Sequence, residues 1–587
     1  MCAARPTPPR RSLARCRPPS REPSDAHSRK PIVLPQGLET IPEVFSRILE
    51  RFGPEVAARW TENGGFESIT YAQLGRRVDR LTRVLVGRGL SGLRIGIVGP
   101  ATVEWITAFF AIAASGNAAV PLDKDLDSET ALALARQARL EGFFIDPGSG
   151  GAARGLLDGL PCARACFGLA PGAGLEDIPA LVGYGTGGGH GEEAAVPEAG
   201  GPPEAPPVAP ESTALLAFTS GTTGWPKLVE LTHRNLTHDL YCSVAVLGQK
   251  VAPGSQTLLA LPPHHVFGIT VTLLTSLWDG ATVCMGSDRR RQAGDVTRFK
   301  PDIIVVPPRF VDVLHRRIWA QARLEGREGR LRRALALSRA LRRVGIDARR
   351  RLLRPVIEGM GGNLRYLIAG GGPLRLELIR EFDELGVTVL NGYGVTECSP
   401  VVACNGIGRN VPGSVGQPGP APYCEVRCRD GEIQVRGSIV MKGYFDDPAG
   451  TAAAMDGDWL RTGDLGRLDA EGNLYVTGRQ PNQIALENGQ TVLPEEIEVR
   501  LEAHPAISSA LVRAVHVDGK TVLGTLVHPA LDLIAAVGAP DPFKAVATAV
   551  REVNSTLPAH HRLRVVDHAQ TDFQRTDVGQ PKRYLYS

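Results

Sequence analysis

The sequence predicts an α/β protein in which a large domain built on parallel sheets precedes a smaller α+β domain. The chain has 587 residues, which is too many for a single ordinary core. Residues 93–122 read strand, helix, strand, an order that is typical of a parallel sheet covered by helices. Residues 479–587 alternate helical and strand patterns and are predicted to form the small domain.

Residues 1–37 are predicted to be a disordered basic tail that precedes the folded chain. The first thirty residues are rich in Arg, Pro and Ser, and no acidic residue occurs before Glu22. This composition suits a targeting segment, but the prolines prevent a continuous amphipathic helix. We expect either a genuine disordered tail or an over-extended start, with the large domain spanning residues 38–478.

The first elements of the large domain have clear boundaries. Thr70 and Gln73 have the spacing of a capping box, and apolar residues then recur on one helical face. LRIGIVG, residues 93–99, predicts a buried strand. The uncharged run 105–122 predicts a buried helix, a turn and a strand, because Gly, Asn and Pro interrupt it and a transmembrane span fits poorly.

Two unusual segments lie inside the large domain. Residues 148–210 are rich in Gly and Pro, so part of this stretch is predicted to be a surface loop or linker. Residues 309–354 carry fifteen Arg against four acidic residues, in a pattern that predicts helices with apolar and basic faces. The basic face has two interpretations, contact with an anionic membrane surface or an ordinary solvated surface.

The region after Val411 is predicted to be a β-rich subdomain, because residues 431–437 and 473–479 read as short alternating strands near turn residues. The net charge of +4 is small for this length and indicates no partner. The basic segment lacks interleaved aromatic residues, so nucleic-acid recognition is unsupported. The ten cysteines lack metal-type spacing and predict reduced thiols in a cytoplasmic protein.

A phosphate-binding loop is predicted within LLAFTSGTTGWPKLVELTHRNL, residues 215–236. A hydroxyl- and glycine-rich loop after a strand offers exposed N–H and O–H donors to phosphate, and Lys227 adds a positive charge. The P-loop pattern GxxxxGK[ST] is absent. The string resembles the phosphate loop of the adenylate-forming superfamily, apart from Leu228, where that family usually has Gly. The resemblance implies a large adenylate-forming domain with a small mobile C-terminal domain.

The resemblance implies a nucleotide site made from this loop and three further motifs. In NGYGVTECSP, residues 391–400, an aromatic ring stacks on adenine, a hydroxyl contacts the α-phosphate, and the carboxylate of Glu397 binds Mg²⁺. In WLRTGDLG, residues 459–466, Asp464 accepts hydrogen bonds from both ribose hydroxyls. The implied nucleotide-binding residues are Thr219, Ser220, Gly221, Thr222, Thr223, Gly224, Lys227, Gly371, Gly372, Tyr393, Gly394, Thr396, Asp464 and Arg479.

Three stretches resemble bacterial long-chain fatty acyl-CoA synthetases within this superfamily. LPPHHVFG contains His265, which by resemblance borders the acyl pocket. VTECSPVVACN and GRQPNQIALENGQTVLPEEIE, residues 478–498, are the other two. The resemblance covers residues 38–583 and implies ATP-dependent activation of a fatty acid through acyl-AMP, with Mg²⁺ and with CoA as acceptor. Transfer to a carrier-protein thiol is an open alternative.

Two positions of the small domain depart from the family pattern. Gln580 stands where the family has a lysine that touches the reacting carboxylate, and Lys582 is two residues further on. On a regular strand both side chains share a face, so Lys582 is an alternative source of the charge. Pro481 occupies the hinge position and restricts its backbone. The implied catalytic residues are Lys227, Thr396, Glu397, His265, Gln580 and Lys582.

These departures leave a second hypothesis open, a protein that binds nucleotide or acyl-adenylate without turning it over. A neutral amide at position 580 donates hydrogen bonds but supplies no charge. The loss of one donor that stabilises the transition state, such as the family lysine, costs roughly 3–4 kcal/mol in comparable sites. The enzyme hypothesis is supported by the otherwise intact nucleotide motifs, which a chain without catalytic function would be free to lose.

Overall fold

The computed structural model describes residues 36–62, 64–160, 164–172, 174–183, 206–219, 225–247, 253–286, 292–486, 491–517, 520–531, 534, 541–558, 561–576 and 579–586. These residues belong to one compact unit that spans positions 34–587. The predicted tail lies outside the described residues except at its last two positions, and the prediction for it stays open.

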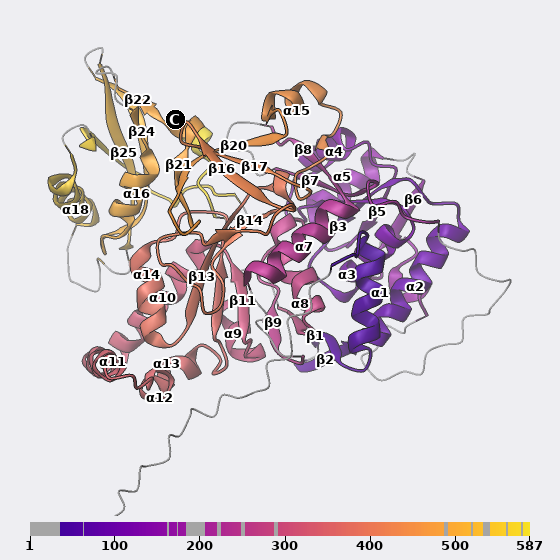
Figure 1. The fold of residues 1–587 in the computed structure, drawn as a ribbon, viewed down its shortest axis with the longest axis horizontal. Coiled ribbons are helices and arrows are strands. Elements are labelled where there is room, and N and C mark those ends of the chain that lie inside the picture. The colour runs from indigo at the N-terminus through magenta and orange to yellow at the C-terminus, as the bar shows by residue number, and fades with distance from the viewer. Residues whose placement is uncertain are drawn as a thin grey trace, which may run out of the picture. The chain divides into compact units, whose positions relative to one another are not determined.

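A seven-stranded sheet is built from strands between residues 94 and 232, with β18 added at one edge (Figure 1). Its five consecutive strands from β7 to β6 are parallel, while β8 and β18 are antiparallel to their neighbours. The strand order is β18 (Gly443–Tyr444), β8 (Leu228–Thr232), β7 (Thr213–Phe218), β4 (Ala118–Leu122), β3 (Arg94–Val98), β5 (Gly142–Ile145) and β6 (Ala165–Gly168).

A nine-stranded sheet forms the second layer of the large domain. It is parallel from β13 to β1, and the strands at its two edges run antiparallel. The strand order is β15 (Gln417–Pro418), β14 (Val401–Cys404), β13 (Thr388–Gly394), β12 (Tyr366–Ala369), β11 (Ile303–Val306), β9 (Gln256–Leu258), β10 (Thr282–Met285), β1 (Val56–Glu62) and β2 (Gly65–Thr70).

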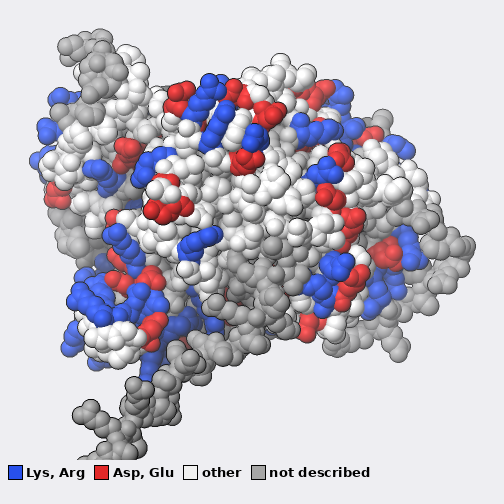
Figure 2. Space-filling model, viewed as in Figure 1, with Lys and Arg blue, Asp and Glu red and all other residues white. Residues whose placement is uncertain are grey.

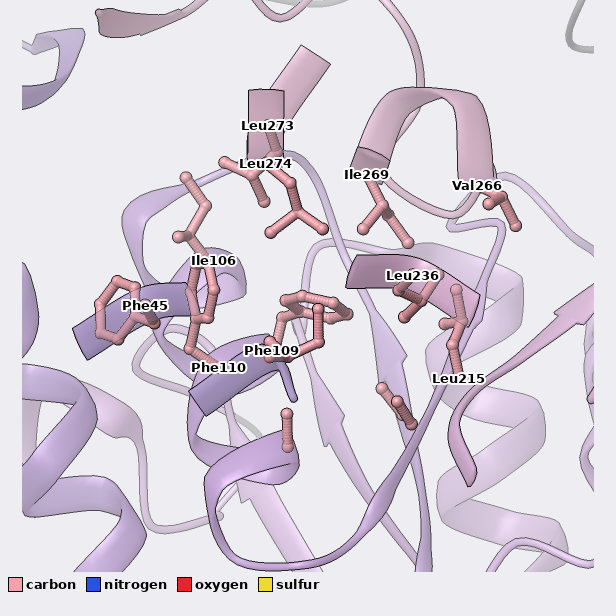
Figure 3. Close-up of a cluster of buried hydrophobic side chains, with 14 of the residues drawn as sticks. Phe45, Ile106, Phe109, Phe110, Leu215, Leu236, Val266, Ile269, Leu273 and Leu274 are labelled. Carbon is pink, nitrogen blue, oxygen red and sulfur yellow. The ribbon is translucent and has the colours of Figure 1, made fainter. Parts of the chain in front are cut away.

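The main core is made by helices that pack aromatic and aliphatic side chains together. These helices are α1 (Ile41–Phe52), α2 (Tyr71–Gly87), α3 (Val103–Ala114), α7 (His233–Leu247), the π-helix η1 (Gly268–Leu274) and α8 (Thr275–Trp278). Figure 3 shows Phe109 and Phe110 of α3 beside Leu236 of α7 and Leu274 of η1. The rings of Phe45 and Phe110 stack with centroids 4.1 Å apart. Burial of such large apolar side chains is the dominant stabilising contribution.

The predictions for the first elements are confirmed. Thr70 and Gln73 make both hydrogen bonds of the capping box at the start of α2. The predicted face is buried, with Leu74, Val78, Leu81 and Leu85 inside. The run 105–122 divides into α3, a turn and β4. Among the described residues, no helix has both the length and the apolar character that crossing a membrane requires.

The surface loop predicted for part of residues 148–210 does not lie in the first half of this stretch. This stretch contains α5 (Gly150–Gly159), β6 and α6 (Ile178–Leu181). The small residues that suggested a loop instead allow close helix packing, because a Cβ on Gly155 would lie 2.3 Å from the Ser128 carbonyl oxygen. Ser128 opens α4 (Ser128–Gln137), so α4 and α5 lie almost in backbone contact. Residues 184–205 lie outside the described residues.

The arginine-rich segment is helical, as predicted. It forms α10 (Pro308–Leu324), α11 (Glu328–Arg343), α12 (Arg349–Leu352) and α13 (Arg354–Gly359). Val311 and Leu314 of α10 and Leu331 and Leu335 of α11 are buried in a core that also contains α14 (Leu376–Leu385) and α9 (Gln292–Phe299). The apolar side of the segment therefore covers the nine-stranded sheet, and most of the arginines face outward.

The β-rich subdomain and the small domain follow in the predicted order. The first contains β16 (Glu425–Arg429), β17 (Glu432–Arg436), β19 (Met455–Asp456), β20 (Trp459–Leu468) and β21 (Leu474–Arg479), with α15 (Pro448–Ala454) beside them. The second contains β22 (Ile484–Ala485), β23 (Thr491–Val492), α16 (Pro494–Glu502), β24 (Ile507–Val517), β25 (Lys520–Pro529), α18 (Pro542–Thr556) and β26 (Val565–His568), with a core of its own. The predicted fold class is confirmed.

Candidate active site

The predicted phosphate loop is closed at its base by two hydrogen bonds. The Thr219 N–H donates to the Lys227 carbonyl oxygen at 2.8 Å, and the Lys227 N–H donates to Thr219 Oγ1 at 3.1 Å. These bonds extend the antiparallel pairing of β7 and β8, so the loop connects two strands of one sheet. Residues Ser220, Gly221, Thr222, Thr223 and Gly224 lie outside the described residues, so their predicted role stays a prediction.

An aromatic ring connects the Lys227 side chain to the predicted metal ligand, Glu397. Its Nζ lies 4.3 Å from the centre of the Tyr444 ring, and the Tyr444 hydroxyl donates to Glu397 Oε1 at 2.8 Å. Tyr444 belongs to β18, which pairs with β8 just after the loop. Burial, together with the neighbouring carboxylate of Glu397, raises the pKa of Tyr444, so this hydroxyl stays protonated and donates.

The predicted adenine and ribose residues form one hydrogen-bonded network. The Tyr393 hydroxyl donates to Asp464 Oδ2 at 2.8 Å, and Arg479 Nε donates to Asp464 Oδ1 at 2.7 Å. Tyr393 comes from β13, while Asp464 and Arg479 are cross-strand partners on β20 and β21. Tyr393 and the paired strands β20 and β21, about seventy residues further along the chain, therefore meet at one carboxylate.

Burial and the neighbouring carboxylate shift the pKa values of two side chains in this network. Burial alone would lower the pKa of Arg479, but the charge of Asp464 outweighs it and raises that pKa. Burial and the charge of Asp464 raise the pKa of Tyr393 well above its ordinary value. Asp464 therefore accepts one hydrogen bond from a cation and one from a neutral hydroxyl. A carboxylate has further lone pairs beyond these two bonds, so it retains capacity for ribose hydroxyls.

The residues between Tyr393 and Glu397 sit on a tightly folded turn. Gly394 ends β13, and a Cβ at this position would lie 1.9 Å from the Pro400 carbonyl oxygen, so only glycine fits. Thr396 and Glu397 then open the short helix η3 (Thr396–Cys398). The turn places the side chains of these two residues after the carboxyl end of a parallel strand, where ligands of α/β sheets usually bind.

The predicted glycine segment follows the neighbouring strand β12. Gly371 has a φ of +86°, a conformation that favours glycine. A Cβ on Gly370 would lie 3.1 Å from the Phe267 ring, so the segment passes under that ring. Phe267 lies two residues after His265, whose carbonyl oxygen accepts the Gly268 N–H at 2.9 Å at the start of η1. The segment containing His265 thus lies against the glycine segment.

Gln580 contacts the glycine segment, and among the described residues no hydrogen bond joins Lys582 to it. Gln580 Nε2 donates to the Gly371 carbonyl oxygen at 2.8 Å, and its Cγ lies 3.8 Å from where a Cβ on Gly372 would be. The regular strand that would have given both side chains one face is missing, because Lys582 directly precedes the short helix η6 (Arg583–Leu585). The geometry therefore supplies an amide where the family pattern has an ammonium group.

The hinge region is a short turn directly after the nucleotide network. Arg479 ends β21, and the short helix η4 (Gln480–Asn482) follows with Pro481 in its first turn. The predicted restriction of this backbone stays a prediction.

The structure gathers the predicted residues into three groups joined by adjacent strands. The groups are Thr219, Lys227 and Glu397, then Tyr393, Asp464 and Arg479, then Gly371, Gly372 and Gln580. Sequence reasoning missed Tyr444, which links the first group, because GYFDD carries no pattern that marks an aromatic residue as part of a site. Within the described residues no cluster of three His, Cys, Asp or Glu side chains forms a protein-only metal cage. A single carboxylate such as Glu397 suits Mg²⁺ that is shared with phosphates.

Comparison with curated proteins identifies relatives that share most of the chain. Long-chain-fatty-acid–CoA ligase FadD15 of Mycobacterium tuberculosis is 29% identical over 481 residues, which covers 79% of this chain and 78% of that protein. Human long-chain-fatty-acid–CoA ligase 1 is 29% identical over 495 residues, covering 78% of this chain and 69% of that protein.

Solved structures share the fold. The anthranilate CoA ligase AuaEII in complex with anthranoyl-AMP superposes with a TM-score of 0.73 at 20% identity, covering 93% of this chain and 96% of that one. ATP-bound MatB from Rhodopseudomonas palustris gives a TM-score of 0.70 at 23% identity, covering 93% and 98%. The profile of the AMP-binding enzyme family matches residues 45–445, and that of the AMP-binding enzyme C-terminal domain matches residues 481–585. The chain belongs to the AMP-binding enzyme family.

Proposed function

We propose that the protein is an acid–thiol ligase that activates a fatty acid, through an acyl-AMP, to an acyl thioester. The observation that carries this proposal is the network in which Tyr393 and Arg479 converge on Asp464. The relatives at 29% identity are long-chain-fatty-acid–CoA ligases, which supports a long-chain acid as substrate and CoA as acceptor. ATP and Mg²⁺ complete the set of reactants that the family uses.

The proposed reaction has two half-reactions. First, a carboxylate oxygen of the fatty acid bonds to the α-phosphorus of ATP, the bond to the bridging oxygen breaks, and pyrophosphate leaves. Second, the thiol loses its proton, its sulfur bonds to the acyl carbon, the carbon–oxygen bond to AMP breaks, and AMP leaves. Between the two, the small domain changes its orientation about the hinge at Pro481.

The side chains of this protein have defined roles in the proposal. Lys227 and Thr396 contact the phosphates, where a cation and a hydroxyl stabilise charge that develops during transfer. Glu397, oriented by the Tyr444 hydroxyl, holds Mg²⁺, which screens phosphate charge when bound. Asp464 accepts the ribose hydroxyls, and His265 borders the acyl chain.

Turnover is favoured over binding alone, although Gln580 replaces the family lysine. The relatives reported above are ligases, and none supports a protein that only binds nucleotide. The amide of Gln580 is held against the backbone of Gly371, so the loop still closes over the glycine segment. We therefore propose that the first half-reaction proceeds with a reduced rate. A carrier-protein thiol in place of CoA is the second acceptor that we propose to test.

We also propose that the arginine-rich helices contact an anionic membrane surface, from which a long-chain acid would be drawn. Figure 2 shows Lys and Arg gathered around an uncharged patch over the region labelled α11 and α12 in Figure 1. Exposed apolar side chains, among them Leu324 and Val344, lie between these arginines. Arg330 and Arg343 are exposed, so their charges are available to lipid headgroups.

The proposed function is tested with purified protein, MgATP, CoA and fatty acids of several lengths. Acyl-AMP, AMP and acyl-CoA are measured separately, with benzoate as a control acid and a carrier protein as alternative acceptor. Palmitate is expected to give AMP and palmitoyl-CoA in equal amounts, and benzoate none. Nucleotide binding without any product from any acid would overturn the proposal. Co-sedimentation with phosphatidylserine vesicles, but not with phosphatidylcholine vesicles, tests the membrane contact, which equal sedimentation with both would overturn.

A further inference from the structure

We propose that Arg309 and Asp572 are positioning residues whose ion pair clamps the last loop of the small domain onto the large domain for the adenylation half-reaction. The inference rests on the proposed function. Neither of these two residues belongs to a family motif that was identified in the sequence. The clamp has two ends, the ion pair itself and the hydrogen bond from Gln580 to Gly371.

The first end joins the start of α10 to the small domain. Arg309 is the second residue of α10, and its Nη2 contacts Asp572 Oδ2. Ser509 Oγ and the Phe573 N–H donate to the other carboxylate oxygen, Asp572 Oδ1, at 2.7 and 2.8 Å. Burial alone would raise the pKa of Asp572, but the Ser509 hydrogen bond and the charge of Arg309 outweigh it and lower that pKa. Asp572 is therefore an ionised and fixed partner for Arg309.

The second end is held by Gln580, and the two ends are neighbours on the large domain. Gln580 Nε2 donates to the Gly371 carbonyl oxygen at 2.8 Å. A Cβ on Gly372 would lie 3.8 Å from both the Gln580 and the Pro308 side chains. Pro308 directly precedes Arg309, so the loop touches the large domain at two adjacent places. The strands β11 and β12, which carry these places, pair directly in parallel.

The loop between the two ends is braced internally, so that fixing one end fixes the other. Arg575 Nη1 donates to the Gly579 carbonyl oxygen at 3.0 Å, and its Nη2 lies 3.4 Å from Asp572 Oδ1. The Thr576 N–H donates to the Gln580 carbonyl oxygen at 2.7 Å, and the Gln580 N–H donates back to Thr576 Oγ1 at 3.2 Å. Position 580 is thereby tied to Asp572 by four polar contacts.

The surroundings show that polar contacts hold the two domains together here. Beside the clamp the two domains line a cavity of about 120 Å³, whose walls include the charged residues Asp312, Arg375 and Glu502. A single neutral hydrogen bond from Gln580 would hold the loop weakly, whereas a charge-assisted pair is stronger and more directional. The clamp is formed in this orientation of the small domain. It therefore favours the half-reaction that uses this orientation, the one in which position 580 faces the glycine segment.

The test separates the two half-reactions in the full-length protein. Acyl-AMP formation is measured from palmitate and MgATP, and thioester formation is measured separately from supplied palmitoyl-AMP and CoA. Arg309→Ala is expected to slow the first about fivefold, the range for a partly exposed ion pair, and to change the second by less than about twofold. The charge swap Arg309→Asp with Asp572→Arg is expected to restore the first. The control Arg436→Ala removes an ion pair of similar exposure, with Glu425, inside the large domain and outside the arginine-rich helices, and is expected to change neither.

Two kinetic results would overturn the clamp. One is equal slowing of both half-reactions, and the other is failure of the charge swap in a variant that unfolds at the wild-type temperature. A second measurement is independent of activity. Hydrogen exchange of the peptide that covers residues 572–583 is expected to be faster in Arg309→Ala and to return to the wild-type rate in the charge swap. Unchanged exchange refutes the clamp even when the wild type is inert, whereas an inert wild type with a responsive peptide refutes only the proposed ligase activity.

Discussion

Replacing Gln580 by lysine is expected to accelerate acyl-AMP formation. Gln580 Nε2 lies 2.8 Å from the Gly371 carbonyl oxygen, and a lysine side chain is longer by one bond, about 1.5 Å. The ammonium group would therefore extend beyond Gly371 toward the space over the glycine segment, where the proposal places the reacting carboxylate. A charged donor that acts at the transition state changes rates by about 10² to 10³-fold, so Gln580→Lys is expected to gain within that range.

The assay for this prediction is single-turnover formation of palmitoyl-AMP from palmitate and MgATP. Gln580→Met is the matched control, because methionine has a similar length but neither a charge nor a hydrogen-bond donor. It is expected to be slower than the wild type. Lys582→Ala is expected to retain acyl-AMP formation, since among the described residues no hydrogen bond joins the lysine to the glycine segment. The reasoning is refuted if Lys582→Ala abolishes acyl-AMP formation while Gln580→Lys leaves it unchanged.

Three further predictions concern stability and nucleotide binding. His233 is 1% exposed, accepts the Ile41 N–H at 3.3 Å, and has its pKa lowered by burial to about 4. The stability that its neutral ring provides is present above pH 6.5 and is lost as pH falls toward 4, by roughly 3 kcal/mol, and urea unfolding of His233→Asn should lack this loss. Burial raises the pKa of Glu498 to about 7 despite the adjacent Arg583. Its contribution is therefore greatest below pH 4.5 and declines as pH rises through 7, by roughly 2–3 kcal/mol, and Glu498→Gln should flatten this decline in the same unfolding series. Asp464→Asn is expected to weaken ATP binding by about tenfold to a hundredfold in calorimetry, with an unchanged melting temperature as the sign that folding is intact.

Local patterns in the sequence predicted most elements of the fold, because each pattern had one dominant physical cause. The capping box at Thr70 and the apolar face of α2 are examples, since a cap and a buried stripe specify a helix without help from distant residues. The helices and strand between residues 150 and 181 were not predicted, because the Gly and Pro content of residues 148–210 suggested a loop. Gly155 lies in one of these helices. The need for glycine at this position is seen only in the packing of α4 against α5, which leaves no space for a side chain.

The candidate site was predictable to the extent that it depends on short motifs. Tyr393, Asp464 and Arg479 were all named from the sequence, and the structure brings them together. Tyr444 was missed because it joins the site through the pairing of β18 with β8, a contact between residues more than two hundred positions apart. The environment of Gln580 was equally out of reach, because it depends on where the small domain places its last loop.

The position of Arg479 couples nucleotide binding to the movement of the small domain. Its Nε binds Asp464, and the next residue in the chain, Gln480, begins the hinge. A ligand that binds Asp464 more tightly in one orientation of the small domain will increase the population of that orientation. By thermodynamic reciprocity, the orientation changes the affinity for the ligand by the same factor. The occupancy of the nucleotide site and the position of the small domain are therefore two measurements of a single coupling free energy.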